Sequence, residues 1–379
     1  MSMTMKKVLA ICLLLVCTFP LLAQKIYQVN EVSEINLGDG RFLYRDAKKE
    51  KPLNGEFRII DGYRSQYVQA EFKEGMFDGK YQEYSHNALR REGSYKEGRK
   101  NGLFREYVGG ALTQEYTFRN DTLDGAVISY FQNGKVSRSA FFKNGREHGN
   151  FKEYNHETGE VRSDNNYEDG LEHGRQWAYL QARYDYTRTY TCEHGKRTGK
   201  YEERFVDTDT PKVLGKYENG MKTGCWLEFN DLGDTLSIEN YANDLLDGEK
   251  VVFTGGVREE IQHYKAGKKD GLFVLLDYST GKPKRETNYK NGRKNGTERV
   301  WVTSNRNDFI ETYTYVNDRR HGPYEAVYQE DKQQNIKAGT LKSKGQYRSD
   351  SRSGHWISYD TTGKIEKECC LLYTSDAAD

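Results

Sequence analysis

One glycine recurs along this chain at nearly constant spacing, and that periodicity limits the fold more than any other feature of the sequence. Neighbouring copies lie 23 to 26 residues apart, except for the last pair, which lie 32 apart. A fixed period of this length is typical of repeat architectures, in which each unit is one small supersecondary element. The recurring glycines are Gly55, Gly79, Gly102, Gly125, Gly149, Gly174, Gly199, Gly224, Gly248, Gly271, Gly296, Gly322 and Gly354.

Each recurring glycine is preceded by two restricted positions. From Gly79 onward another glycine or an aspartate stands four residues earlier, and the residue directly before every copy is Asn, Asp, His, Thr or Ser. Asn-Gly and Asp-Gly are strong hairpin signals, since both residues tolerate positive φ. We therefore predict a tight turn at the recurring glycine of each unit, and a left-handed or bulged conformation at the earlier glycine.

Aromatic residues also keep fixed places in the repeat. A ring stands seven residues before the recurring glycine, and Cys192 replaces it in one unit; further rings often stand two and five residues after the glycine. Second turn signals, such as Asn133-Gly134, join one unit to the next. With no convincing helical periodicity, the pattern predicts an all-β chain, an extended antiparallel β-meander or solenoid of about 12 β-hairpin repeats of roughly 24 residues.

The units resemble a known repeat family. The segment from Tyr95 to Tyr107, with Gly98 and Gly102, is similar to the MORN-repeat variant. The resemblance covers about residues 53–365, and the family includes bacterial proteins labelled YwqK-family antitoxin components. It implies two functions, an antitoxin or immunity role against a partner toxin and association with a membrane surface. Cys192 and an insertion at about 328–345 depart from the pattern.

The two ends of the chain differ from the repeats. Lys6 and Lys7 precede an apolar run, so residues 1–23 are predicted to be a secretory signal peptide cleaved before Gln24. Residues 24–52 are expected to cap the array, and residues 53–365 to form it. The tail at 370–379 resembles a translated sequencing adapter and is predicted to be non-native. The mature protein is expected to be exported and to be periplasmic, outer-membrane-associated or secreted.

Charge and cysteine content argue against nucleic acid and membranes as partners and against a disulfide. The 58 basic and 57 acidic side chains give a net charge of +1 and are mixed along the chain, so no nucleic-acid footprint is present and membrane contact is disfavoured. Cys192 and Cys225 occupy different positions in neighbouring repeats. An exported protein permits a disulfide between them, but two free buried thiols fit these positions better.

No residue pattern indicates catalysis or a cofactor. His148, His173 and His321 share the position before the recurring glycine, but Asn, Asp, Thr and Ser occupy it elsewhere, and His tolerates positive φ. The other histidines, His194 among them, show no ligand spacing along the chain. Glu83, Glu106 and Glu153 repeat regularly, as expected of a solvated sheet face paired with Lys and Arg. We predict a non-enzymatic protein with no cofactor and no metal site.

The rings are the best candidates for binding, although they are expected mainly to fill a thin sheet. Rings two and five residues after the glycine should lie on opposite faces of a strand, so one row can be exposed. Trp226 with Phe229, and Trp356 with Tyr359, form such pairs. The leading hypothesis is an exported scaffold that contacts an unidentified protein or cell-surface polymer.

Overall fold

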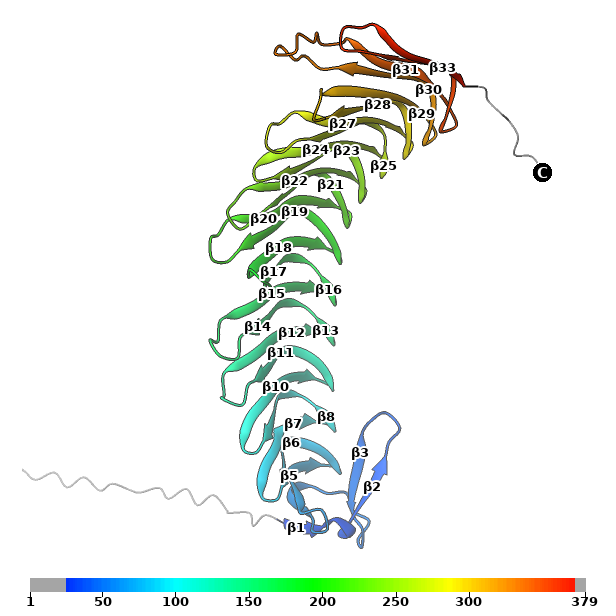
Figure 1. Cartoon of the computed structure of the whole chain (residues 1–379). Helices are drawn as coiled ribbons and strands as arrows, with labels where there is room; N and C mark the ends of the chain where they lie inside the picture. Colours follow the sequence, from blue (N-terminus) through cyan, green and yellow to red (C-terminus); the bar gives the residue numbers. More distant parts are fainter. Residues whose placement is uncertain (1–24, 372–379) are drawn as a thin grey trace, which may run out of the picture. The chain divides into compact units, whose positions relative to one another are not determined.

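The computed structural model describes residues 25–371 of the chain and consists almost entirely of β-strands (Figure 1). No α-helix occurs within these residues; a single 3-10 turn, η1, spans Val29–Glu31. Within the described part no helix is long and apolar enough to span a membrane. The all-β prediction is therefore confirmed. The predicted signal peptide, residues 1–23, lies outside the described residues.

The chain divides into two compact units, of which the first ends at Lys135. From β4 to β11 successive strands pair antiparallel, with the short β8 and then β9 both pairing with β7, and β1 lies parallel to β4 at the edge of this sheet. The strands are β1 (Lys25–Gln28), β2 (Val32–Asn36), β3 (Phe42–Asp46), β4 (Gly55–Asp61), β5 (Gln66–Lys73), β6 (Met76–Ser85), β7 (Ala88–Lys96), β8 (Arg99–Lys100), β9 (Gly102–Val108), β10 (Ala111–Arg119) and β11 (Thr122–Tyr130).

The second unit begins at Val136 and repeats the same antiparallel meander. Its first half contains β12 (Val136–Lys143), β13 (Arg146–Glu147), β14 (Gly149–Tyr154), β15 (Val161–Glu168), β16 (Leu171–Glu172), β17 (Gly174–Leu180), β18 (Tyr186–Glu193), β19 (Lys196–Phe205), β20 (Pro211–Glu218), β21 (Met221–Phe229) and β22 (Thr235–Ala242). Its second half contains β23 (Leu245–Thr254), β24 (Val257–Lys265), β25 (Lys268–Lys269), β26 (Gly271–Leu276), β27 (Pro283–Lys290), β28 (Arg293–Val302), β29 (Phe309–Val316), β30 (Arg319–Tyr328), β31 (Leu341–Arg348), β32 (Ser351–Tyr359) and β33 (Ile365–Leu371).

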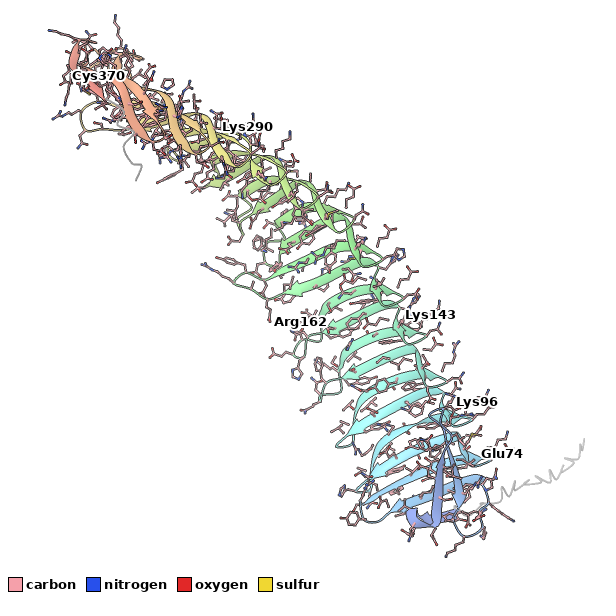
Figure 2. All side chains as sticks on the ribbon, turned by 90° about the vertical axis from the view of Figure 1, so that its right-hand side faces the viewer. Glu74, Lys96, Lys143, Arg162, Lys290 and Cys370 are labelled. Carbon is pink, nitrogen blue, oxygen red and sulfur yellow. The ribbon has the colours of Figure 1, made fainter. Side chains whose placement is uncertain are left out.

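The tight turns lie earlier in each unit than the sequence pattern predicted. Glu74 and Gly75 join β5 to β6 with φ of 51° and 78°, which is the double positive φ of a type I′ hairpin turn. The corresponding pairs recur in the later units, where Glu97 keeps the glutamate and Asn, Asp, His, Ala or Ser replaces it elsewhere. Figure 2 labels Glu74 and Lys96 beside two such turns, on the same edge of the first unit. We call this edge of each unit the tight-turn edge.

The recurring glycine, predicted to form the turn, forms a bulge instead. Gly79 lies inside β6 with φ of 115°, and the pairing of β5 with β6 shifts between Ala70 and Phe72. A Cβ atom here would also collide with the Glu71 carboxylate. The position therefore needs glycine, but as a bulged residue. Positive φ is shared by Gly102, Gly125, Gly149, Gly174, Gly199, Gly224, Gly248, Gly271, Gly296, Gly322 and Gly354.

Side chains from neighbouring repeats hold the tight turns in place. Asp78, directly before Gly79, accepts a hydrogen bond at 3.1 Å from the backbone N–H of Glu97, the first turn residue of the next repeat. Asn54 caps Glu74 in the same way at 2.8 Å. Where aspartate replaces the first glycine, as at Asp121, its carboxylate caps the backbone N–H of Lys100 in the preceding repeat at 2.7 Å. At both restricted positions, acidic and amide side chains can thus cap turns across repeat junctions.

Rings from successive strands pack on one face of the sheet, which we call the ring face. In the first unit Phe104, only 1% exposed, stacks edge-on against Tyr95 and Phe118, with both centroid distances at 5.4 Å. Cations such as Lys100 lie over these rings, at 5.0 Å from the Phe118 centroid. Similar stacking recurs in the second unit, as in the contact of Tyr217 with Trp226. The rings seven before and two after the recurring glycine are thus mainly structural.

A glycine under Phe104 gives a direct test of this packing. A Cβ atom at Gly93 would lie 2.5 Å from the Phe104 ring, and the φ of Gly93 is not positive, so the obstacle is steric. Gly93→Ala is expected to lower the free energy of unfolding by about 1–3 kcal/mol, measured by urea denaturation. Gly62→Ala is the matched control, because nothing lies within 4 Å of a Cβ atom there. Equal stabilities of the two variants would contradict this account.

The N-terminal segment covers the start of the first unit. The hairpin of β2 and β3 carries Tyr44, whose ring lies 4.9 Å from that of Phe77. Leu53 is 2% exposed, and its carbonyl accepts a hydrogen bond from Gly75 at 2.9 Å. Because β1 also pairs along β4, the segment shields both the first rings and the edge strand.

The second unit departs from a regular array at two places. The predicted insertion near 328–345 is a loop between β30 and β31, anchored by Ile336, which is 3% exposed. Cys370 and Leu371, which fall in the tail predicted to be non-native, pair with His355 and Gly354 of β32. The rest of that tail lies outside the described residues.

Candidate functional site

Two residues that the sequence offered for binding are buried. Trp226 is 5% and Trp356 is 6% exposed, and both rings belong to the ring face. Gly215 and Gly345 lie directly beneath them. Trp226 and Trp356 are therefore core residues, and the prediction that they contribute to a binding surface was wrong.

The rings five residues after the recurring glycine remain partly accessible. Phe229 and Tyr359, the partners predicted for the two tryptophans, are half-buried. The same intermediate burial holds for Tyr84, Tyr107, Tyr130, Tyr154, Tyr179, Phe253 and Trp301. One partly exposed ring per repeat thus recurs along much of each unit.

In the first unit these tyrosines belong to a charged network. The Tyr107 hydroxyl donates to Glu92 at 2.9 Å, and the Tyr130 hydroxyl donates to Glu115 at 2.7 Å. Arg105 lies between the two carboxylates, 2.8 Å from Glu115 and 3.5 Å from Glu92. Hydrogen bonds from Arg105 and Tyr130 lower the pKa of Glu115. We call this surface, defined by Glu92, Arg105, Tyr107, Glu115 and Tyr130, the Tyr-Glu face.

The repeated glutamates bind arginine, as predicted, but they are not fully solvated. Arg91 lies 2.8 Å from Glu106 and 3.4 Å from Glu83. Tyr81, a ring-face residue, donates to Glu83 at 3.2 Å. The side chains of both glutamates are a quarter to a third exposed, so this row borders the ring face. Glu153 follows the register and accepts a hydrogen bond from Ser163 at 3.3 Å.

Cys192 and Cys225 are free thiols, as the sequence favoured, although only Cys192 is buried. Burial raises the pKa of Cys192 to about 12, and its thiol donates to Glu172 at 3.3 Å. Such a thiol is unreactive, because the nucleophile is the thiolate. Cys192 therefore fills the position of the missing ring.

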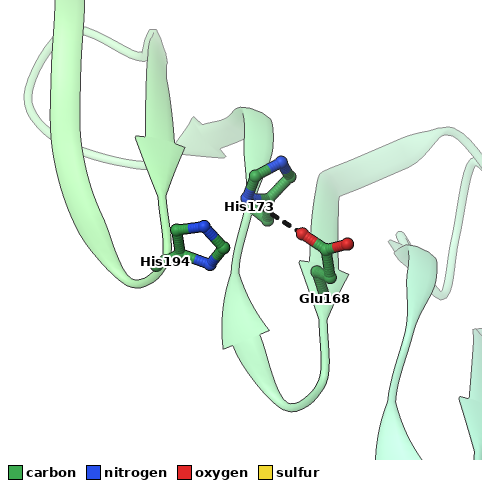
Figure 3. A group of neighbouring side chains, drawn as sticks. All are labelled: Glu168, His173 and His194. Carbon is green, nitrogen blue, oxygen red and sulfur yellow. Dashed lines mark ion pairs between the residues drawn. The ribbon is translucent and has the colours of Figure 1, made fainter.

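A group of potential metal ligands lies on the tight-turn edge of the second unit (Figure 3). Glu168 ends β15, His173 directly precedes β17, and His194 is the first residue of the tight turn between β18 and β19. One ligand atom from each residue lies within 4.8 Å of the others. The two imidazole rings are 5.3 Å apart, and Nδ1 of His173 is 3.4 Å from the Glu168 carboxylate.

No spacing along the sequence predicts that these three residues lie together. His173 shares its register with His148 and His321, and tolerance of positive φ is the expected reason for histidine there. The explanation was wrong, since these three residues do not have positive φ, whereas His194 has a φ of 46°. Aligning the repeats would have revealed the group, because the position before a recurring glycine contacts the tight turn of the next repeat.

A match to a family model supports the repeat assignment in two segments. Residues 123–144 and 352–371 match the model of the MORN repeat variant. No curated protein matches the sequence. Similar solved structures include a eukaryotic initiation factor with 8% identity and a TM-score of 0.18, covering 89% of this chain and 95% of that one.

Two further solved structures resemble the chain at the same low level. A TcdB2-TccC3-Cdc42 complex has 13% identity and a TM-score of 0.16, and the match covers 80% of this chain and 16% of that one. A europium-containing methanol dehydrogenase has 10% identity and a TM-score of 0.12, and the match covers 90% of this chain and 73% of that one.

Proposed function

We propose that this protein is an exported, non-enzymatic repeat scaffold that binds an extended partner, a protein or a cell-surface polymer, through the Tyr-Glu face. The observation that carries the proposal is the row of half-buried rings, one in most repeats, on the face opposite the packed ring face. The MORN-variant matches fit a repeat scaffold involved in binding.

The spacing of these rings suits an extended ligand. Equivalent rings in adjacent repeats are two strands apart, or about 9.6 Å for strands spaced 4.8 Å. A tyrosine offers a flat apolar surface together with a polar hydroxyl, which makes it effective in both protein and glycan recognition. A partner that lies across the strands would meet a ring at each step.

The charges on this face add polar contacts of both signs. Arg105 stands between two glutamates, and the hydroxyls of Tyr107 and Tyr130 fix these carboxylates in position. Because the network exists before binding, little side-chain entropy is lost when a partner docks. Mixed charge favours a polar partner of either sign, in contrast to nucleic acid or an anionic membrane.

A site-specific crosslinker tests this function in the cells that produce the protein. With photoreactive p-benzoyl-phenylalanine at position 107, irradiation is expected to yield one discrete adduct with a partner. The partner's affinity is then measured with the purified protein, and Tyr107→Ser with Tyr130→Ser is expected to weaken it at least about tenfold, the loss typical of central aromatic contacts.

The same crosslinker at Tyr63 is the control, because that side chain is 99% exposed in the loop between β4 and β5, away from the strands. Adducts that are equally abundant from both positions, or absent from position 107, would contradict the proposed binding face. An exported toxin recovered as the partner would connect this scaffold to the antitoxin role of the family it resembles.

A further inference from the structure

We propose that Glu168, His173 and His194 form a binding site for one zinc ion or a similar divalent transition metal. Two imidazoles and one carboxylate are a common donor set for zinc, which then keeps its fourth position open to water or another ligand. The proposal is independent of the binding function of the Tyr-Glu face.

The positions of the ligand atoms are close to those that zinc requires. Zinc binds histidine nitrogen and carboxylate oxygen at about 2.0–2.2 Å in tetrahedral geometry, so that ligand atoms lie about 3.3 Å apart. The distance of 3.4 Å between His173 Nδ1 and the Glu168 oxygen fits this value. The remaining separations, up to 4.8 Å, can shorten by side-chain rotation, since His194 is exposed and Glu168 is only half-buried.

The hydrogen bonding of His173 supports a ligand role. In three repeats the side chain at this register caps a tight turn of the next repeat: Asn54, Asp78 and Asp270 each accept a bond from a backbone N–H there. His173 Nδ1 makes no hydrogen bond, although it is shielded from solvent and faces the Glu168 carboxylate. A shielded nitrogen without a partner is costly, and a metal ion would satisfy it.

Such a metal would link two adjacent repeats. Glu168 and His173 flank the hairpin of β15 and β17, whereas His194 belongs to the tight turn of the next repeat. Nitrogen donors select zinc, nickel or copper over calcium and magnesium, which prefer sites made only of oxygen. The metal would add to the backbone bond from the Gly195 N–H to the Glu172 carbonyl, 2.8 Å long, which already joins these two repeats.

The test uses the purified full chain without a histidine tag, stripped of metal and titrated with zinc chloride by calorimetry. All proteins carry Cys369→Ser and Cys370→Ser, because these exposed thiols can bind zinc themselves. We expect one zinc ion per chain, and visible d–d absorption of tetrahedral cobalt when cobalt replaces zinc. Mutation of a residue that only orients a metal ligand lowers metal affinity about 10–100-fold, so loss of a ligand itself should lower zinc affinity at least tenfold.

The variants are chosen to preserve the turns. Glu168→Gln, His173→Asn and His194→Asn should each weaken zinc binding at least tenfold, and asparagine suits both histidine positions because other repeats use it there. Asp169→Asn, which alters a charge next to Glu168, and His321→Ala, which alters the register of His173 elsewhere, should bind zinc as the parent does. Circular dichroism confirms that each variant is folded.

Three results would overturn the proposal: a parent protein that binds no zinc, ligand variants that bind it as tightly as the parent, or control variants that lose it equally. Absence of the cobalt absorption band in the parent would also count against tetrahedral coordination by these residues.

Discussion

Phe104→Ala is expected to lower the free energy of unfolding of the first unit by about 3–5 kcal/mol, the usual cost of removing a buried ring. Phe104 is 1% exposed, stacks on Tyr95 and Phe118, and covers Gly93. The loss would leave both rings without their shared partner and open a cavity above a residue that has no side chain to fill it. Urea denaturation measures the change.

Leu103→Ala is the matched control for this substitution, because Leu103 is adjacent on β9 and 42% exposed. Its effect should stay below about 1 kcal/mol. Hydrogen exchange gives a second readout, since β7, β9 and β10 should lose protection together in the Phe104 variant. A Phe104 variant as stable as the Leu103 variant would show that the ring face does not hold the unit together.

Glu203→Ala is expected to lower the free energy of unfolding by about 3 kcal/mol, near the lower end of the range for breaking a buried ion pair. Its carboxylate is 6% exposed and accepts hydrogen bonds from Lys212 at 2.7 Å, Tyr201 at 2.6 Å and Arg188 at 2.9 Å. The substitution leaves two cations facing each other. Because these cations are nearly a third exposed, water softens the penalty.

The pH dependence of stability gives this prediction a second readout. Burial alone would raise the pKa of Glu203. The hydrogen bonds from Lys212, Tyr201 and Arg188 together have a larger, opposite effect, so the pKa lies below the usual value of 4.5. The stabilisation is therefore present above about pH 4.5 and is lost as pH falls through the lower folded value. In Glu203→Gln the free energy of unfolding should therefore fall less as the pH is lowered. In the control Glu218→Ala, a change of an exposed residue on β20, it should fall as it does in the parent protein.

The sequence predicts the strands and the packed rings well because both depend on local alternation. Phe72, Phe104 and Tyr217 could be identified as fillers of a thin sheet from their register alone. The tight turn was misplaced because Asn-Gly resembles a type I′ turn, whereas Glu74 at positive φ looks unfavourable. Asn54, twenty residues away, supplies the hydrogen bond that stabilises Glu74 in that conformation. The conformational preference of a residue and its sequence neighbours does not account for a hydrogen-bond partner in another repeat.

The candidate sites show the same limit. Parity correctly separates Trp226 from Phe229, but only packing determines which of the two rings is covered. A search of the sequence for metal-ligand spacing misses the group of potential metal ligands, because Glu168 and His173 belong to one repeat and His194 to the next. Both features depend on how one repeat stacks on its neighbour.

The caps at the repeat junctions bear on how such a chain can change in length. Asp78 and Asn54 recognise backbone N–H groups, which every repeat offers at the same place whatever its side chains. A gene duplication or deletion of one whole repeat would therefore create a junction with its capping bond intact. Pairs such as Arg91 with Glu106 depend on particular side chains, so these few contacts would restrict which repeats can be exchanged during evolution.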